Sequence, residues 1–479
     1  MSEAASALRA RIARLGGLPG GQRASQQPPT RASAAAPIGT PTPRSRLLGA
    51  PAGVERSLDH LGFLPEVNAA GLAWVRRTSV ELAPFLEVAG APAPVTTAQL
   101  LRLTAGAGAA AATAGGGVER DPGWGEDQVA VVDIESLGLH GSGVVAFLVG
   151  IGVPRGSRLE VDQVLLADMG AEPAQLLALL DRLARCRVIV TYNGRTFDLP
   201  ILRSRAIVNR LLTWTEPPLH CDLLGPVRRL FRDRLGACTL RQAEQALLGF
   251  WREDDVPGSE APARYRTWLY TGLAAAIEGV IQHNQLDLCT TMVLAARMAA
   301  HVDGLLMTPA HPADRYRLGL HLERRGGVAD EVDSHLRAAA LSGRAPWGRE
   351  ASLKLAGRLR RAGGTPGRRE AIALLRRLVA ADADDLRAAR QLAIALERAG
   401  ALEEALGVSE RALSACLRLG EWRLQRMRSA PPSGWSADWR KRTGRLRTRV
   451  ERAGRGQMPP PLVAAAGAGA CEAPPLLAY

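Results

Sequence analysis

The sequence predicts an α/β domain built on a mixed sheet, followed by an all-α region. Two observations predict this order. Between about residues 129 and 222, short apolar runs typical of buried strands are interrupted by helical stretches. After about residue 305, apolar residues recur at helical spacing in units that repeat along the chain. A chain of 479 residues, 47% of them hydrophobic, is long enough for two or three domains.

The α/β region begins with strands. Residues 71–82 (GLAWVRRTSVEL) predict one or two strands at the edge of the sheet. The elements predicted next are strands at 129–132, 144–153 and 159–166, a helix at 173–186, a strand at 188–190 and a helix from Phe197. The order strand, strand, strand, helix, strand, helix fits a mixed sheet flanked by helices.

The segment 131–138 (VVDIESLG) places two acids at the end of a buried strand. Asp133 and Glu135 are two residues apart, so both side chains lie on one face of the strand. Like charges at this spacing repel, and a cation between them relieves the repulsion. Mg²⁺ and Mn²⁺ prefer oxygen ligands of this kind. Taken alone, the pair is more typical of a solvated strand end.

A second acid lies in the segment RVIVTYNGRTFDLPIL, after the strand at 188–190. Asn193 and Gly194 predict a turn, and Asp198 lies in the first turn of the helix that follows. The alternative role for Asp198 is an acid that stabilises a helix N-terminus through the helix dipole.

A third polar segment, IQHNQLD, interrupts the Ala- and Leu-rich stretch 273–300, which predicts one long helix. His283 and Asp287 are four residues apart and therefore share one face of that helix. The alternative is an ordinary His–Asp pair on a helix surface.

The order D-x-E, N-x-x-x-F-D, H-x-x-x-D resembles the DEDD superfamily of 3′–5′ exonucleases, which has a ribonuclease H-like fold. Within it, the chain is most similar to the bacterial YprB-type group. The resemblance covers about residues 125–300 and is carried by three segments, 131–152, 188–205 and 220–258, the last running on to the HNQLD motif.

The resemblance implies a metal-dependent nuclease, a 3′–5′ exonuclease acting on single-stranded DNA or RNA. It assigns two Mg²⁺ or Mn²⁺ ions to four carboxylates. Asp133 would bridge both ions, Glu135 and Asp287 would complete the first site, and Asp198 would serve the second. Two such cations, roughly 4 Å apart, lower the pKa of the attacking water and neutralise the leaving oxygen. Asn193 and Phe197, from the second motif, are the predicted substrate-binding residues.

The third motif departs from the superfamily pattern. DEDD enzymes carry a Tyr four residues before the final Asp, or a His five residues before it. Here His283 stands at the Tyr spacing. Imidazole titrates near neutral pH, so His283 is a candidate general base and is included with the catalytic residues. A packing role or an indirect role beside the metal ligands stays open.

Four further polar residues have modest predicted roles. In the segment HCDLL, His220 and Asp222 lie on one face of a short predicted strand. We favour Asp222 as a cap for the helix at 223–232 over a position near the metals. Asp254 and Asp255, in REDDVPG, predict a solvated turn into Pro257-Gly258. The six cysteines show no C-x-x-C spacing, which argues against zinc.

Charge is concentrated at the two ends of the chain. Residues 1–57 contain eight arginines and two glutamates, a net charge of +6, and residues 417–479 carry +8. These ends account for the whole +14 excess, and residues 58–416 are near neutral. The basic ends could attract polynucleotide phosphates or act as solubilising tails. No apolar run is long enough to span a bilayer, and the scattered cysteines predict a cytoplasmic protein.

The all-α region resembles tetratricopeptide repeats. Leu392-Ala393, Leu396 and Gly400 match the spacing of small and large apolar positions in that repeat, and Ala371 and Ala405 are 34 residues apart, its period. Such an array would offer a platform for a protein partner or for the enzyme's own substrate. Simple α-helical packing is the alternative.

The predicted organisation has five parts. These are a disordered basic tail at 1–57, a lead-in with strands and a Gly/Ala linker at 58–124, a ribonuclease H-like exonuclease domain at 125–302, tetratricopeptide-like helices at 305–455 and a disordered tail at 456–479. The alternative function is a non-catalytic nucleic-acid-binding or protein-interaction scaffold with the same domains.

Overall fold

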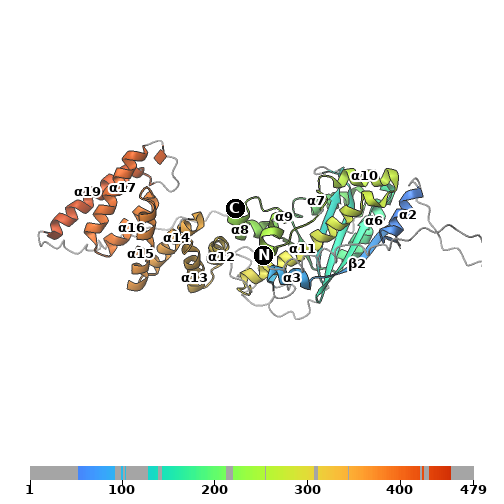
Figure 1. The fold of residues 1–479 in the computed structure, drawn as a ribbon, viewed down its shortest axis with the longest axis horizontal. Coiled ribbons are helices and arrows are strands. Elements are labelled where there is room, and N and C mark those ends of the chain that lie inside the picture. Colours follow the sequence, from blue (N-terminus) through green and yellow to red (C-terminus); the bar gives the residue numbers. More distant parts are fainter. Residues whose placement is uncertain are drawn as a thin grey trace, which may run out of the picture. The chain divides into compact units, whose positions relative to one another are not determined.

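The fold is that of a computed structural model (Figure 1). It describes residues 52–91, 99–100, 103, 128–138, 143–211, 219–253, 255–306, 311–343, 345–420, 423–424 and 431–454. The chain divides into two compact units, and the boundary lies between Val332 and Asp333, inside helix α13 (Ala329–Ala340). The predicted linker at 105–117 and most of both predicted tails lie outside the described residues.

The first unit contains a mixed sheet of seven strands in the order β1-β2-β5-β4-β3-β6-β7. The strands are β1 (Leu64–Asn68), β2 (Gly71–Glu81), β3 (Val129–Ser136), β4 (Ala146–Arg155), β5 (Arg158–Leu165), β6 (Val188–Thr191) and β7 (Leu219–Asp222). β3 is antiparallel to β4 but parallel to β6, and β6 is parallel to β7. The predicted mixed sheet is therefore confirmed. The strand predicted at its edge, 71–82, is instead an inner strand, because β2 pairs with β1 on one side and with β5 on the other, and β1 is the edge strand.

Helices cover both faces of this sheet (Figure 1). Along β3 the side chains alternate: Val129 and Val131 pack in one core cluster with Leu288 of α11, whereas Ala130, Val132 and Ile134 pack in another with α6 and α7. The helices of the unit are α2 (Ala52–His60), α3 (Ala83–Ala89), α6 (Glu172–Leu183), α7 (Asp198–Val208), α8 (Leu224–Leu235), α9 (Leu240–Ala243), α10 (Ala261–Thr271), α11 (Glu278–Val302) and α12 (Pro312–Arg324), with short turns η2 (Met169–Ala171), η3 (Glu244–Leu248) and η4 (Ala274–Ala276).

Two predicted domain boundaries need correction. The sequence predicts the first at residue 57, but the folded part of the chain begins earlier. Helix α2 buries Val54 and Leu58, and the indole Nε1 of Trp268 donates to Ser57 Oγ over 2.8 Å. The sequence predicts the second at 302–305, but α12, which follows it, belongs to the first unit. Its Leu318 joins the core beside α8, and Asp314 accepts from Arg234. Apolar contacts, which local composition does not reveal, extend the first unit at both ends.

The second unit is a series of antiparallel helices. They are the end of α13, α14 (Pro346–Ala362), α15 (Thr365–Ala381), α16 (Leu386–Arg398), α17 (Leu402–Leu419) and α19 (Trp435–Gly454). The predicted small residues Ala371 and Ala405 are both buried. Helix α15 begins at Thr365, directly after Gly363 and Gly364. The helical region is confirmed, and its tetratricopeptide identity stays a prediction.

None of the helices that the structure describes is long and apolar enough to cross a membrane.

Candidate functional site

The end of strand β3 carries the first two acids of the site. Asp133 and Glu135 lie on the β3 face that α11 covers, as the alternation predicts, and Glu135 is buried, with 8% of its surface exposed. The register with β4 shifts between Glu135 and Ser136, so a bulge ends the regular pairing at the second acid.

Asp198 reaches the same place from the neighbouring part of the sheet. Pairing between β3 and β6 ends at Val131, so the edge of β3 beyond that point has no strand partner on the β6 side. Asp198, the first residue of α7 and 4% exposed, accepts a hydrogen bond there from the backbone N–H of Ile134 (3.2 Å). The carboxylate thus completes the ladder where β6 stops and lies beside Asp133 and Glu135.

A chain of buried polar side chains holds Asp133 from the other side. Arg76 can only donate, and its Nη1 donates to Gln163 Oε1 (2.7 Å). Gln163 Nε2 therefore faces Asn284 Oδ1 (2.9 Å), and Asn284 Nδ2 donates to Asp133 Oδ2 (2.8 Å). The arginine fixes the orientation of both amides, and the last donor in the chain positions the carboxylate of Asp133.

Gly150 makes this contact possible. It lies opposite Asp133 in the β3–β4 ladder, directly beneath α11. A Cβ atom at this position would collide with Asn284 Oδ1 and would lie 2.7 Å from Leu288 Cδ1. The absence of a side chain at Gly150 lets α11 approach the sheet closely enough for Asn284 to reach Asp133.

His283 and Asp287 face the acids from α11, as their spacing predicts. His283 Nε2 lies 3.9 Å from Glu135 Oε1 and 3.7 Å from Asp287 Oδ2, and both α11 side chains are largely buried. The other ring nitrogen, Nδ1, lies 2.6 Å from Asp255 Oδ1. Asp255 is therefore not in a solvated turn, as we predicted; its side chain is 5% exposed and pairs with the histidine of the site.

Arg252 links this group of residues. Its buried guanidinium donates to Glu244, to Asp287 Oδ1 and to Asp255 Oδ2, the last over 3.4 Å. Glu244 itself is fully buried in η3 and also accepts from Thr290 Oγ1 (2.5 Å). Arg252 and Asp255 thus contact α11 through Asp287 and His283. The second oxygen of Asp287, Oδ2, stays directed toward His283.

The protonation of these groups follows from burial and mutual repulsion. Burial, then the charges of Asp287, Asp198 and Glu135, raises the pKa of Asp133 well above its usual range. Burial raises the pKa of Glu135 to about 8 and that of Asp198 to about 7, although hydrogen bonds from backbone N–H groups act against the second shift. The site therefore has more carboxylates than cations to balance them.

The Asp255–His283 pair has the opposite character. Burial acts to raise the pKa of Asp255, but the hydrogen bond with His283 and the charges of His283 and Arg252 hold it at about 2. Burial alone would lower the pKa of His283, and Asp255, Asp287 and Glu135 together raise it. Because an ionised Asp255 only accepts, the proton on Nδ1 is directed to it, and Nε2 faces the acids.

The two predicted substrate-binding residues occupy the loop between β6 and α7. Asn193 adopts a left-handed conformation (φ 69°), and its Oδ1 accepts from Thr196 Oγ1 (2.7 Å). Phe197 is partly buried against the core under α6 and α7. Asp222 Oδ1 accepts from the backbone N–H groups of Asn193 and Leu224, so it holds this loop and caps α8, as we favoured from the sequence.

The donor set fits divalent cations by its chemistry. Asp133, Glu135, Asp198 and Asp287 are oxygen ligands, and burial of the first three makes their charges costly without a cation. Among the residues that the structure describes, however, no group of three or more His, Cys, Asp or Glu side chains is gathered tightly enough to hold an ion. Asn284 donates to one oxygen of Asp133, and Arg252 donates to one oxygen of Asp287.

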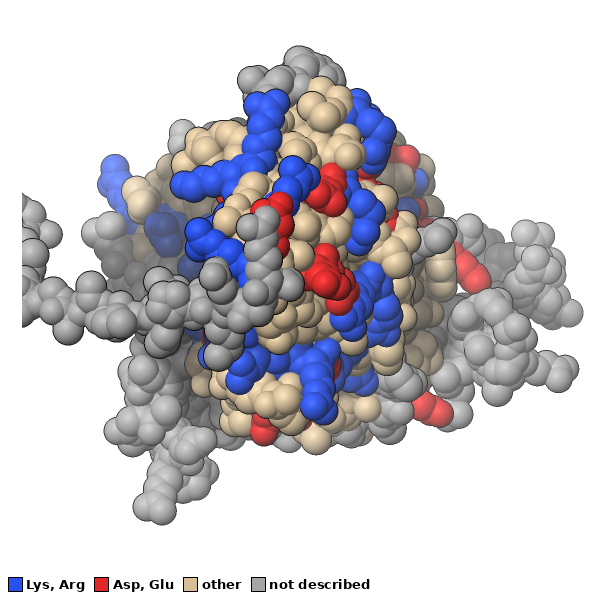
Figure 2. Space-filling model, turned by 90° about the vertical axis from the view of Figure 1, so that its left-hand side faces the viewer, with Lys and Arg blue, Asp and Glu red and all other residues tan. Residues whose placement is uncertain are grey.

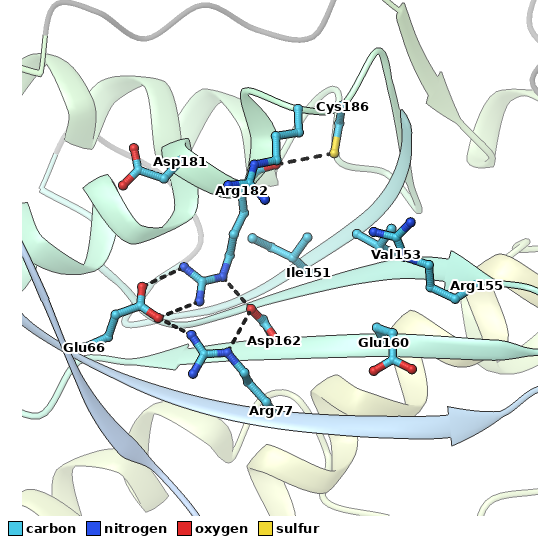
Figure 3. A pocket seen from close by; sticks show the side chains of 11 residues that line it. Glu66, Arg77, Ile151, Val153, Arg155, Glu160, Asp162, Asp181, Arg182 and Cys186 are labelled. Carbon is cyan, nitrogen blue, oxygen red and sulfur yellow. Dashed lines mark hydrogen bonds and ion pairs between the residues drawn. The ribbon is translucent and has the colours of Figure 1, made fainter. Parts of the chain in front are cut away.

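A cavity of about 460 Å³ lies apart from this site (Figure 3). It is lined by Ile151, which points to the α6 face of the sheet, away from Asp133. Two of its arginines are already paired: Arg182 with Glu66 and Asp162, and Arg77 with the same two acids. Figure 3 shows the four side chains joined across the cavity. This arrangement is typical of a structural ion network.

Comparison with known proteins identifies the α/β unit. Residues 130–299 match the family model of the RNase_H superfamily. The match begins in β3 and ends in α11, the two elements that carry most of the acidic site. The chain is also 29% identical over 198 residues to the uncharacterized protein YprB of Bacillus subtilis, covering 41% of this chain and 48% of that relative. The predicted resemblance to a ribonuclease H-like domain is confirmed over these residues.

Sequence reasoning missed three residues of the site. Asn284 had a visible signal, because it is an amide between His283 and Asp287 on a largely apolar helix. Arg252 and Asp255 had none: one is an arginine in an arginine-rich chain, and the other lies in a segment that resembles an ordinary turn. Only the tertiary structure brings them to α11.

Proposed function

We propose that this protein is a divalent-metal-dependent nuclease that hydrolyses phosphodiester bonds of single-stranded nucleic acid, acting as a 3′–5′ exonuclease. One observation carries the proposal: Asp133, Glu135 and Asp198 converge from β3 and α7 and have pKa values raised by burial, while Asp287 faces them from α11. Such a cluster is stable in its ionised form only with added positive charge.

The ligands in this proposal are the four carboxylates, with Mg²⁺ or Mn²⁺ as the ions. When bound, the two cations would lower the pKa of the attacking water and stabilise the leaving oxygen. The residues of the chain keep the ligands oriented. Asn284 holds Asp133, the N–H of Ile134 holds Asp198, and Arg252 holds one oxygen of Asp287.

His283 is proposed as the general base. Asp255 accepts a hydrogen bond from the Nδ1–H of His283, so neutral His283 presents the lone pair of Nε2 between Glu135 and Asp287. A water molecule at that point could lose its proton to Nε2 as it attacks phosphorus. Asp255 is a positioning residue, because it acts through the imidazole.

One observation favours the alternative, a nucleic-acid-binding protein that does not cleave. The guanidinium of Arg252 already pairs with Asp287, so it supplies part of the positive charge that a metal ion would bring. In that case Asp287 would be a structural partner of Arg252.

A cleavage assay with 5′-labelled single-stranded DNA and RNA separates these functions. With Mg²⁺ or Mn²⁺, a 3′–5′ exonuclease gives a ladder of shortened labelled products, and EDTA abolishes it. Release of the label as a mononucleotide would show the opposite polarity. Isothermal titration calorimetry with Mn²⁺ reads the metal site directly, and the control is Asp133→Asn. Wild-type protein that neither binds Mn²⁺ nor cleaves would favour the non-catalytic alternative.

A further inference from the structure

An arginine recurs at the same place in three successive helical hairpins. The sequences LERRG (322–326), LRRAG (359–363) and LERAG (396–400) align with Arg324, Arg361 and Arg398 at one position, each 37 residues from the next. The glycine two residues later has a positive φ in all three, 72°, 81° and 81°. Each arginine therefore lies in the last turn of its helix, two residues before a glycine in the left-handed region.

Within the second unit, two of these arginines lie on one edge. Arg361 and Arg398 are exposed at the C-terminal ends of α14 and α16. Arg360 lies between them: its Nη1 donates to the backbone oxygen of Gln391 in α16 (3.1 Å). Burial, then the charges of Arg398 and Arg361, lowers the pKa of Arg360. The guanidinium of Arg360 is thus close enough to both of the others to be repelled by them.

The end of α19 brings further positive charge to this edge. Val450 and Ala453 line a hollow together with Gly400 and Leu402, so the last turn of α19 lies beside the turn that follows Arg398. Arg452 is exposed in that last turn. Glu403 and Glu404 also line the hollow, and Glu404 is paired with Arg376. Figure 2 shows basic side chains over much of this end of the molecule.

Within the part of the chain that the structure describes, these three arginines have no acidic partner, and the same holds for some other exposed arginines of the unit, such as Arg377 and Arg440. Among the residues that the structure describes, Arg361, Arg398 and Arg452 form no ion pair. Other exposed arginines of the same unit do, including Arg376 with Glu404, Arg418 with Asp384 and Arg447 with Glu410. A group of unpaired like charges on one edge costs free energy unless an anion neutralises it.

The distribution of charge follows the same division. Residues 58–332 contain 26 basic and 31 acidic residues, a net charge of −5, whereas residues 333–479 contain 27 basic and 14 acidic residues, a net charge of +13. The near-neutral balance of residues 58–416 therefore combines a net charge of −5 over residues 58–332, which hold the candidate site, with a net charge of +5 over residues 333–416 of the helical unit.

We propose that the edge formed by Arg361, Arg398 and Arg452 binds the phosphate backbone of single-stranded nucleic acid. The guanidinium is the side chain best matched to phosphate oxygens, because it donates two parallel hydrogen bonds. An arginine repeated at a fixed period suits a polymer with regularly spaced charges. The choice of nucleic acid over an acidic protein rests on the proposed nuclease function, since the unit that would cleave has too little positive charge to hold a polyanion.

Fluorescence anisotropy of the full chain tests this surface. The probes are fluorescein-labelled oligo(dT) and oligo(U), titrated in EDTA over a range of salt concentrations. The variant is Arg361→Ala/Arg398→Ala/Arg452→Ala. The control, Arg376→Ala/Arg418→Ala/Arg447→Ala, removes the same charge from arginines that already have acidic partners. A set of Gln substitutions at the first three positions keeps the side-chain stems, in case the Ala variant fails to fold.

Loss of three phosphate contacts should reduce the salt-dependence slope, log Kd against log salt, by about 2, and weaken binding at low salt by about tenfold or more. The control should bind like the wild type. Equal binding by both triple variants would overturn the proposal. Displacement of the oligonucleotide by polyglutamate at equal charge concentration would also overturn it and assign the edge to an acidic protein. Because EDTA prevents turnover, the result is independent of whether the chain cleaves.

Discussion

Asp255 Oδ1 accepts a hydrogen bond from the Nδ1–H of His283 (2.6 Å). It thereby determines that the unprotonated ring nitrogen, Nε2, faces the acids of the site. The two residues are 28 positions apart in the chain. Arg252 Nη1 also lies 3.3 Å from the same nitrogen, but it can only donate and cannot replace the carboxylate as an acceptor. The tautomer of His283 therefore depends on the charge of Asp255.

Asp255→Asn should lower the pKa of His283 and reduce activity by about 10²–10⁴-fold. The amide removes a negative charge that raises the pKa, and its NH₂ group, like Arg252, can donate to Nδ1 and move the proton to Nε2. NMR titration of the histidine ring measures the pKa without any turnover. Glu260→Gln, at the exposed residue directly before α10, is the matched control. An unchanged pKa and rate would show that Asp255 only stabilises the fold.

His283→Ala should lower the cleavage rate by roughly 10²–10⁴-fold if the imidazole is the general base. The acidic limb of the pH–rate profile should change with it, because a group that titrates near neutral pH is lost. Mn²⁺ affinity should change little, since the carboxylates remain. His283→Tyr tests the spacing to Asp287, and partial activity is expected. Near wild-type rates for both variants across pH would assign His283 a packing role.

Deleting residues 1–51 should leave the melting temperature unchanged, whereas deleting residues 1–57 should lower it. The longer deletion removes Val54 from the core and the Ser57 hydroxyl from Trp268, which costs on the order of 2–4 kcal/mol. The shorter deletion removes seven arginines, so nucleic-acid binding should become weaker and less dependent on salt. Loss of turnover at saturating substrate in a folded 1–51 deletion would place the tail in the catalytic site.

The strands and the acidic residues could be predicted because their signals are local. Alternation along β3 assigns Asp133 and Glu135 to one face, and helical spacing assigns His283 and Asp287 to one face of α11. Each pattern spans only a few residues. The resemblance to a known family then supplied the order in which these elements meet.

The remaining parts of the site depend on contacts between distant segments. Gln163 matters because it is opposite Arg76 on β2, and Asn284 matters because Gly150 lets α11 approach. The sequence predicts a turn at Asp255 because nothing in its own segment indicates that it contacts His283 of α11. Similarly, α12 resembles the later helices in sequence, yet its contacts with α8 attach it to the first unit.

Gly150→Ala should destabilise the protein by about 1–3 kcal/mol, the usual cost of overpacking. The added methyl group displaces the side chains of Asn284 and Leu288, so the hydrogen bond to Asp133 is lost as well. Mn²⁺ affinity should fall for this reason, even under conditions where the protein is fully folded. Gly143→Ala is the control, because its Cβ would meet no atom within 4 Å. Equal stability and metal affinity for both variants would show that α11 can move away without consequence.

The stability of the metal-free protein should fall as the pH rises from about 4 to about 8. In the folded state the pKa values of Glu135 and Asp198 are raised to about 8 and about 7, and that of Asp133 is also raised. A carboxyl group with a raised folded-state pKa holds its proton more tightly in the folded than in the unfolded state. Its ionisation therefore destabilises the fold above the unfolded-state pKa.

Asp133→Asn removes one of these charges and keeps an acceptor for Asn284. It should therefore stabilise the metal-free protein at pH 8, by on the order of 1–3 kcal/mol, and have little effect at pH 4. Added Mn²⁺ should stabilise the wild type and leave the variant unchanged. The difference between their free energies of unfolding at pH 8 should therefore become smaller or change sign. Urea denaturation of wild type and variant at pH 4 and pH 8, each with and without Mn²⁺, measures the difference in their free energies of unfolding under all four conditions. If Asp133→Asn is instead less stable than the wild type at pH 8 in EDTA, the carboxylates do not repel one another as their burial indicates, and the metal assignment loses its physical basis.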